Sequence, residues 1–431
     1  MSIRSDAQAI APQLRQLRRR LHRIPEIGLV LPKTQAVVLE ALEGLGLEIT
    51  TGRDLSSVTA VLRGGGSGGP VVLLRGDMDA LPVMEESDEE YVSQHMGAMH
   101  ACGHDMHTAG LIGAARLLAA RRDELSGDVV FMFQPGEEGH DGAAYMIDQG
   151  VLDAAGRPVE AAYGLHVMSS LLPPGVFSGR PGRLMAASDG LFVRVVGSGG
   201  HGSRPMEALD PIPVAAQMVT ALQNLVTRRF DVFDPVVLTV GSFHAGTRRN
   251  IIPDDATFEA TVRTFSTEAS DRMAELAPQL CRDIAAAGGM TAEVRYEKEY
   301  PATINDGGEY EFVADTVREV FGERRYRPLQ DPVMGSEDFS RVLERVPGSY
   351  IFLGTGVNED PGESASNHSP RAVFDDAFVA DGAALLAELV IRRMNRQLCP
   401  VWRVGRIGHL ATHDYHPAVS PYSVECRYDH N

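Results

Sequence analysis

The strand-like segments of this chain are of two kinds, and the second kind is confined to the middle of the sequence. Before about Met185 these segments are apolar throughout, as in "PVVLLRG", "DVVFMF" and "AAYGLHV", and they alternate with helical patterns such as the one that starts at Thr108. Continuous apolar strands that alternate with helices are typical of a sheet covered on both faces. The first part of the chain is therefore predicted to fold as an α/β layer.

The second kind of segment alternates apolar with polar residues, as strands with one wet face do. It occurs in "DGLFVRVV", "VVLTVGSF" and "ATFEATVRTFS", with helical patterns at residues 212–225 and 270–287 between such segments. After about Pro301 the first pattern returns, with the strand "GSYIFLGTG" and a final helix from Ala377 to Met394. A chain of 431 residues is too long for one core. We predict an α/β domain, residues 1–185 and 303–396, interrupted by an α+β domain of residues 186–302.

Composition excludes several classes of partner. The formal charge of −18 argues against nucleic acid and anionic membranes, which attract clustered Lys and Arg. No apolar run is long enough to span a bilayer and no secretory leader is recognisable, so a cytoplasmic location is expected. The four cysteines are too scattered for a disulfide framework. Residues 397–431 follow no periodicity and are predicted to be a disordered or vector-derived tail rather than a metal site, although they contain His409, His413, His416 and His430.

The segment "MHACGHDMH", which begins at Met99, holds three histidines, a cysteine and an aspartate. Cys, His and carboxylate are the protein ligands of zinc-like ions. Cys102 and His104 are separated by one residue, so both side chains can project to the same side of an extended or turn segment. A single Cys or His is usually an ordinary packing or polar residue, but this density favours a metal site.

Six further candidate ligands follow predicted strands: Asp77 and Asp79 after "VVLLRG", Glu137 and Glu138 after "FMFQPG", His166 in "YGLHV", and His368 after "YIFLGTG". In open α/β sheets, ligands collect at the carboxyl ends of the strands. Solvated loop acids are the alternative for the four carboxylates. That alternative accounts poorly for two adjacent acids between Gly136 and Gly139. The pattern predicts one shared metal site.

The adjacent glutamates also suggest catalysis. One carboxylate can bind a metal while the other takes a proton from coordinated water, whose pKa falls to about 7. These groups suffice to hydrolyse an amide or ester. A serine hydrolase is excluded, because the G-x-S-x-G match at residues 65–69 is followed by a strand and not by a helix. A protein that only binds metal or amino acids would have no use for a free base.

The motifs "RGDMDALP", "HACGHDMHTA", "QPGEEG", "GLHV", "GGHGSRP", "RRNIIPD", "MGSEDFS" and "NHSP" occur in an order that resembles the M20 family of metallopeptidases. The resemblance is strongest to its amidohydrolase branch, which includes hippurate hydrolase, N-acyl-L-amino-acid amidohydrolase and indole-acetyl-amino-acid hydrolases, and it runs from Leu21 to about Met394. It implies a two-metal centre in a mixed-sheet α/β domain. It also implies that the inserted domain is a lid and dimerisation surface, so a homodimer or homotetramer is expected.

The resemblance assigns roles to particular residues. The metal ligands that it implies are Cys102, His104, Glu138, His166 and His368, with Cys102 bridging where many relatives have an aspartate. One or two ions of Mn, Zn, Co or Ni are expected. Glu137 corresponds to the general acid/base, and Asp79 to a residue that orients a ligand or the base. Asp77 stands where other M20 branches have a ligating His, which leaves the occupancy of the first metal position open.

The inserted domain also carries residues that the resemblance marks. His201, in "GGHGSRP", corresponds to a residue that stabilises the oxyanion, often from a partner subunit. Asn250 and Arg263 match positions that grip the substrate, on its carboxylate. For Asn250 the alternative is a turn residue before "IIP", and for Arg263 a solvated strand residue.

The expected reaction is metal-dependent hydrolysis of the amide bond of small N-acyl L-amino acids, such as N-benzoyl or N-acetyl derivatives, which releases a carboxylic acid and an amino acid. Metal-coordinated water, deprotonated by Glu137, would attack the carbonyl, and Glu137 would pass the proton to the leaving amine. A dipeptidase or aminoacylase of another M20 branch is the alternative. The cysteine in place of a bridging aspartate favours the amidohydrolases. No motif indicates the acyl group.

Overall fold

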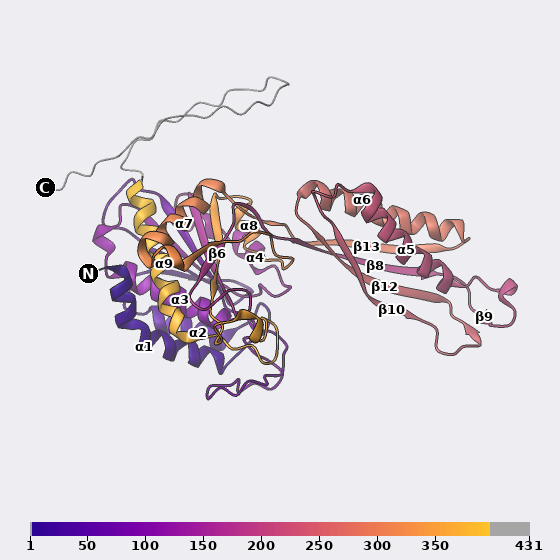
Figure 1. Cartoon of the computed structure of the whole chain (residues 1–431), viewed down its shortest axis with the longest axis horizontal. Helices are drawn as coiled ribbons and strands as arrows, with labels where there is room; N and C mark the ends of the chain where they lie inside the picture. The colour runs from indigo at the N-terminus through magenta and orange to yellow at the C-terminus, as the bar shows by residue number, and fades with distance from the viewer. Residues whose placement is uncertain (1, 397–431) are drawn as a thin grey trace, which may run out of the picture.

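The computed structural model describes residues 2–396 and has two lobes (Figure 1). The larger lobe is built on a mixed eight-stranded sheet in the order β1-β2-β4-β3-β5-β16-β6-β15. Its central strands β4, β3, β5 and β16 are parallel to one another, whereas β1, β2 and β6 pair antiparallel. The strands are β1 (Glu48–Thr51), β2 (Val58–Leu62), β3 (Val71–Asp77), β4 (Asp128–Gln134), β5 (Ala161–Met168), β6 (Phe177–Gly179), β15 (Tyr326–Pro328) and β16 (Gly348–Gly354).

Helices cover both faces of this sheet. On one face lie α1 (Ile3–His22), α2 (Pro32–Leu42), α3 (His104–Ala119), α7 (Gly307–Phe321) and α9 (Val379–Arg396), and on the other lie α4 (Gly142–Asp148) and α8 (Ser340–Leu343). The position of strand β3 explains why its residues are apolar throughout. Val72 and Leu74 pack into the core of the first face, and Val71 and Leu73 into that of the second. Because successive side chains of a strand alternate between faces, a sheet covered on both needs continuous apolar strands.

The smaller lobe, which we call the inserted domain, has an antiparallel sheet in the order β10-β12-β8-β13. Its helices α5 (Pro211–Arg229) and α6 (Thr267–Ala287) cover only one face, and in β12 buried residues alternate with more exposed ones. The predicted mixed α/β class with an inserted α+β unit is confirmed, and the domain boundaries stay a prediction. The strands are β8 (Ala187–Val196), β10 (Val237–Ala245), β12 (Asp255–Thr264) and β13 (Thr291–Tyr300).

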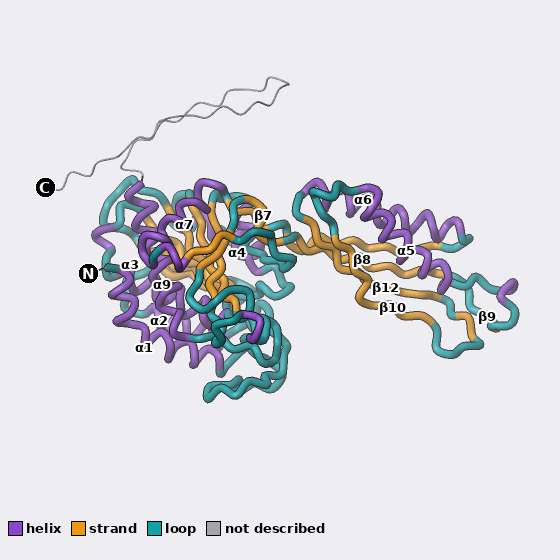
Figure 2. The backbone as a smooth tube through the Cα atoms, in the orientation of Figure 1, coloured by secondary structure: helices purple, strands orange, loops and turns teal. Residues whose placement is uncertain are grey.

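Figure 2 shows the strands of the inserted domain extending away from the larger lobe. At the junction, β7 (Gly182–Met185) pairs with β14 (Thr303–Asn305), just outside the ends of β8 and β13. At the far tip, β9 (Gly200–His201) pairs with β11 (Ile251–Ile252) (Figure 1). The inserted domain thus has one end beside the larger lobe and one end remote from it.

Two further predictions concern segments outside these elements. The G-x-S-x-G segment lies between β2 and β3, so a strand does follow it. The predicted tail and its histidines lie outside the described residues. Within residues 2–396, no helix combines the length and apolar character that a membrane crossing requires.

Candidate metal centre

Four parallel strands end at the same edge of the larger sheet. Strand β3 ends at Asp77, β4 is followed by the turn of residues 135–141, β5 carries His166 near its end, and β16 is followed by the loop that holds His368. Because these strands point the same way, their carboxyl ends meet, and the side chains that follow them converge.

The start of α3 places two further candidates at this edge. Gly103 has a φ of 83°, and a Cβ built there would lie 2.4 Å from Cγ2 of Val167, so only glycine fits. The helix begins at His104, four residues before the predicted start at Thr108. Cys102 therefore precedes the helix, and His104 occupies its first turn.

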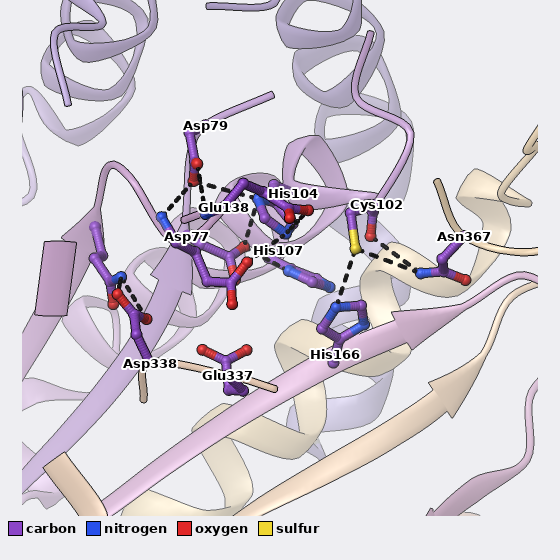
Figure 3. A network of polar contacts seen from close by, with 12 residues as sticks. Asp77, Asp79, Cys102, His104, His107, Glu138, His166, Glu337, Asp338 and Asn367 are labelled. Atoms are coloured by element: carbon purple, nitrogen blue, oxygen red, sulfur yellow. Dashed lines mark hydrogen bonds and ion pairs between the residues drawn. The ribbon is translucent and has the colours of Figure 1, made fainter. Parts of the chain in front are cut away.

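Cys102 belongs to two groups of possible ligands. One is Cys102, His104 and His166, and the other is Cys102, Glu138 and His368; within each group the ligand atoms lie within 4.8 Å of one another. The Sγ atom of Cys102 is 3.4 Å from Nε2 of His166 and 3.3 Å from Nε2 of His368. Figure 3 shows the sulfur directed toward the ring of His166. Because the two groups share the sulfur of Cys102, these residues could hold two ions next to each other.

The imidazole of His104 lacks a partner for the nitrogen that faces this site. Its Nε2 atom is buried and makes no hydrogen bond to any described residue. The nearest carboxylate oxygens, on Glu137 and Glu138, are 4.0 Å away, which is too long for a hydrogen bond. A buried polar atom without a partner is costly, and a bound divalent cation would satisfy it. The residues present therefore fit a metal.

His166 is also arranged as a ligand. Its Nδ1 atom lies 2.7 Å from the carbonyl oxygen of Val167 and donates to it, which leaves Nε2 free to face Cys102. Burial lowers the pKa of His166 well below its usual value. Neutral imidazole, with one nitrogen fixed by a backbone carbonyl, is the form in which His binds metals.

His368 is held in place by strained backbone. Its φ is 70°, a conformation that costs free energy for a residue with a Cβ and is found mainly at functional sites. Its N–H donates to the carbonyl of Ala101 at 2.8 Å. The adjacent Asn367 donates to the carbonyl of Val167 at 3.1 Å and accepts from the N–H of Ser169 at 2.9 Å. Sequence inspection gave Asn367 no role, although it precedes His368 in "NHSP".

Asp79 contacts both His104 and the turn of residues 135–141, which carries Glu137 and Glu138 and is called the glutamate turn below. Its Oδ1 and Oδ2 atoms accept from the backbone N–H groups of Glu137 and Glu138, each at 3.0 Å. Its Oδ1 atom is also 3.4 Å from Nδ1 of His104. The side chain thus orients a candidate ligand from one side and the candidate base from the other.

Replacing Asp79 with Asn should lower kcat/KM or metal affinity by about 10- to 100-fold, the usual effect of losing a residue that orients a ligand. The amide keeps the shape of the side chain but sets an N–H donor against a backbone N–H. Steady-state kinetics and metal content measure both effects. The matched control is Asp153→Asn, on an exposed residue. Equal kinetics and metal content in the two variants would show that Asp79 has no such role.

Asp77 forms a further possible ligand group with His104 and His107, but both of its oxygens already have protein partners. Its Oδ1 atom accepts from Nδ1 of His107 at 2.6 Å, and its other oxygen pairs with the buried Arg75. Nε2 of His107 accepts the N–H of Val167 at 2.8 Å, so both ring nitrogens of His107 are used. Asp77 and His107 therefore form a hydrogen-bonded support behind His104, which lies 3.7 Å from Asp77 (Figure 3).

A buried cluster of acids lies beneath Glu137. Arg75 donates to Glu337 at 2.7 Å and to Asp338 at 3.0 Å. Burial, reinforced by the carboxylates of Glu337 and Glu138, raises the pKa of Glu137 well above its usual value, and a cation bound nearby would lower it again. The sequence pattern suggested no role for Glu337 and Asp338, although two adjacent acids in "MGSEDFS" resemble the Glu137–Glu138 pair.

The candidate ligands open into a cavity of about 460 Å³ at the junction of the two lobes. Glu137 lines it without belonging to either Cys102 group. Arg263 enters from the inserted domain and donates to Ser336 at 2.9 Å. It forms no ion pair among the described residues, although Glu299 and Asp189 lie near enough to raise its pKa against the larger lowering effect of burial. The remaining wall includes four apolar side chains: Met168, Met185, Val333 and Phe352.

His201 and Asn250 lie elsewhere. Both are exposed at the far tip of the inserted domain, where the N–H of Gly202 donates to the carbonyl of Asn250 at 2.9 Å (Figure 1). Neither lines the cavity. The structure thus brings Arg263, but not His201 or Asn250, to the candidate ligands of the same chain, and the roles predicted for the latter two stay predictions.

Comparison with known proteins identifies what this chain is similar to. The family model described as "Peptidase family M20/M25/M40" matches residues 73–392. "Thermostable carboxypeptidase 2" of Saccharolobus solfataricus is 38% identical over 397 residues, which are 91% of this chain and 98% of that protein. "IAA-amino acid hydrolase ILR1-like 4" of Arabidopsis thaliana is 37% identical over 381 residues, covering 87% and 84% of the two chains.

A solved structure shares the fold as well as the sequence pattern. The Bacillus subtilis YXEP protein, described as a dinuclear metal binding peptidase from the M20 family, superposes with a TM-score of 0.76 at 32% identity. The match covers 90% of this chain and 99% of that one.

Proposed function

The chain belongs to peptidase family M20/M25/M40, and from this premise we propose that it hydrolyses the amide bond of N-acyl L-amino acids. Membership of the family makes the chain a metal-dependent hydrolase of amide bonds. Our proposal adds that its substrates are N-acyl L-amino acids. The observation that carries it is the cavity, whose wall Glu137 lines outside the two ligand groups that share Cys102.

The proposed ligands of a divalent cation are Cys102, His104 and His166 at one position and Cys102, Glu138 and His368 at the other. Ions held there would polarise the substrate carbonyl and make water a better nucleophile near neutral pH. Thiolate, imidazole and carboxylate together suit Mn, Zn, Co and Ni.

The protein's own groups account for the remaining steps. Glu137 takes the proton of the attacking water and later delivers it to the leaving nitrogen, as a general base and then a general acid. Arg263, whose guanidinium donates to the neutral Ser336, binds the α-carboxylate of the substrate. The apolar wall of Met168, Met185, Val333 and Phe352 holds the acyl group.

His201 is proposed to donate to the developing oxyanion, and Asn250 to contact the substrate. Because both lie at the far tip of the inserted domain, they reach a metal centre from a second copy of this chain or after a large rotation of that domain. We favour the second copy, in a homodimer or homotetramer formed through the inserted domain.

The test combines metal removal with a substrate panel. Activity should fall to background with EDTA and return with added Mn or Co. N-benzoyl, N-acetyl and indole-acetyl amino acids should be cleaved faster than unblocked dipeptides. Faster cleavage of dipeptides or of peptide C-termini would support a peptidase, in line with the relative named carboxypeptidase. Activity that survives complete metal removal would rule the proposal out.

A further inference from the structure

The junction between the two lobes touches the turn that carries Glu137. The chain returns from the inserted domain at Tyr300, the last residue of β13. Tyr300 is buried and lines the cavity. Tyr300 is therefore placed to link the position of the inserted domain to the cavity.

The hydroxyl of Tyr300 bonds to the glutamate turn in two places. It donates to the carbonyl oxygen of Glu137 at 2.7 Å and accepts from the N–H of Asp141 at 3.2 Å. Asp79, which follows β3, holds the N–H groups on the other side of the same turn. The peptide of Glu137 is thus fixed between a carboxylate of the larger lobe and a phenol of the inserted domain.

Arg341 makes a second, independent connection between the same two segments. Its Nη2 atom donates to the carbonyl of Glu299 at 2.6 Å and to Oδ2 of Asp141 at 2.8 Å, and its Nε atom donates to Oδ1 of Asp141 at 3.2 Å. Asp141 has a φ of 52°, so the end of the turn is held in a conformation that costs free energy. Residues 299–300 and the turn of residues 135–141 are therefore coupled at two points.

We infer that Tyr300 is a positioning residue that ties Glu137 to the inserted domain, so that the position of this domain sets the direction of the Glu137 carboxylate. Arg263 lies on β12 of the same sheet. A substrate bound by Arg263 thereby restrains the inserted domain and, through Tyr300, the base. The role in turnover rests on the proposed function, whereas the mechanical tie does not.

The first test is Tyr300→Phe, which removes only the hydroxyl. Loss of this hydrogen bond should lower kcat by about 10-fold, because small displacements of a catalytic group are costly. KM and metal content should stay within about two-fold of the parent values, since the ligands and Arg263 are untouched. The matched control is Tyr296→Phe on the same strand, whose hydroxyl donates to Asp189 at 2.8 Å inside the inserted domain. The control should keep its kcat even if it loses thermal stability.

A second readout does not need turnover. In hydrogen–deuterium exchange without substrate, amides 137–141 should exchange about 10-fold faster in Tyr300→Phe than in Tyr296→Phe, because the hydroxyl bonds the turn directly. Arg341→Lys should likewise speed the exchange of these amides and lower kcat. If Tyr300→Phe does not fold, Arg341→Lys replaces it as the test variant.

The outcomes separate the two proposals. Unchanged exchange and kcat in Tyr300→Phe, or equal losses in both Tyr→Phe variants, would overturn the tie. If the parent enzyme cleaves no N-acyl amino acid, the proposed function fails, and the exchange experiment still decides whether the tie exists.

Discussion

Replacing Glu137 with Gln should lower kcat by about 10²- to 10⁴-fold while the metal content stays at the parent level. The amide has the shape of the carboxylate but cannot accept the proton of the attacking water. Glu137 belongs to neither Cys102 group, and its peptide is held by Asp79 and Tyr300 through backbone atoms that the substitution leaves in place. Steady-state kinetics on an N-acyl amino acid and elemental analysis of the purified enzyme measure the two quantities.

Two further variants sharpen the Glu137 experiment. Glu137→Asp keeps a carboxylate but withdraws it by one methylene, so its kcat should lie between those of the parent and Glu137→Gln. Glu43→Gln makes the same chemical change on an exposed residue and should leave kcat unchanged. A Glu137→Gln enzyme with a near-parent rate would show that another group takes the proton.

The second large effect is expected at Cys102. Cys102→Ala removes the one side chain that both ligand groups share and leaves each with two donors. The affinity for metal should fall by more than about 100-fold, because loss of a residue that only orients a ligand already costs up to about 100-fold. Activity should fall to background unless metal is supplied in large excess. Titration of the metal-free protein with Mn or Zn, followed by calorimetry, measures the change.

The natural control for Cys102 is the other buried free cysteine of the described residues. Cys281 lies in the core of the inserted domain, so Cys281→Ala should keep the metal affinity of the parent. Cys102→Asp offers a harder bridging ligand and should recover binding with a preference shifted toward Mn. Full metal affinity in Cys102→Ala would exclude the bridging role.

The larger lobe was predictable because its strands are buried on both faces, as β3 illustrates. Strand β13, Thr291–Tyr300, was not predicted. It is an edge strand of the inserted sheet, and most of its residues are charged or exposed, so the alternation of apolar and polar residues in "TAEVRYEKEY" is too weak to indicate a strand. Tyr300 was missed with it, since its importance depends on where β13 ends and not on the residue type.

The candidate ligands predicted from the sequence do gather at one edge of the larger sheet. They could be predicted because Cys, His and acidic residues follow the predicted strands. Sequence inspection could not identify the partners of those residues. Arg75 meets Glu337 across 262 positions of sequence, and only the fold brings them together. Likewise, the spacing in "MHACGHDMH" does not distinguish His104, whose Nε2 atom lacks a partner, from His107, whose two nitrogens are both satisfied.

A cation held at the proposed ligands would lie close to the acids around Arg75 and would stabilise the folded chain. Asp77, Glu337 and Asp338 share one guanidinium, and Glu137 offers an oxygen within 4.8 Å of the latter two. Crowded anions repel one another, and a ligand that binds only the native state stabilises it by mass action. The melting temperature would then rise with the concentration of free cation. Melting temperatures of this protein can be compared only when they are measured at the same buffered concentration of free metal.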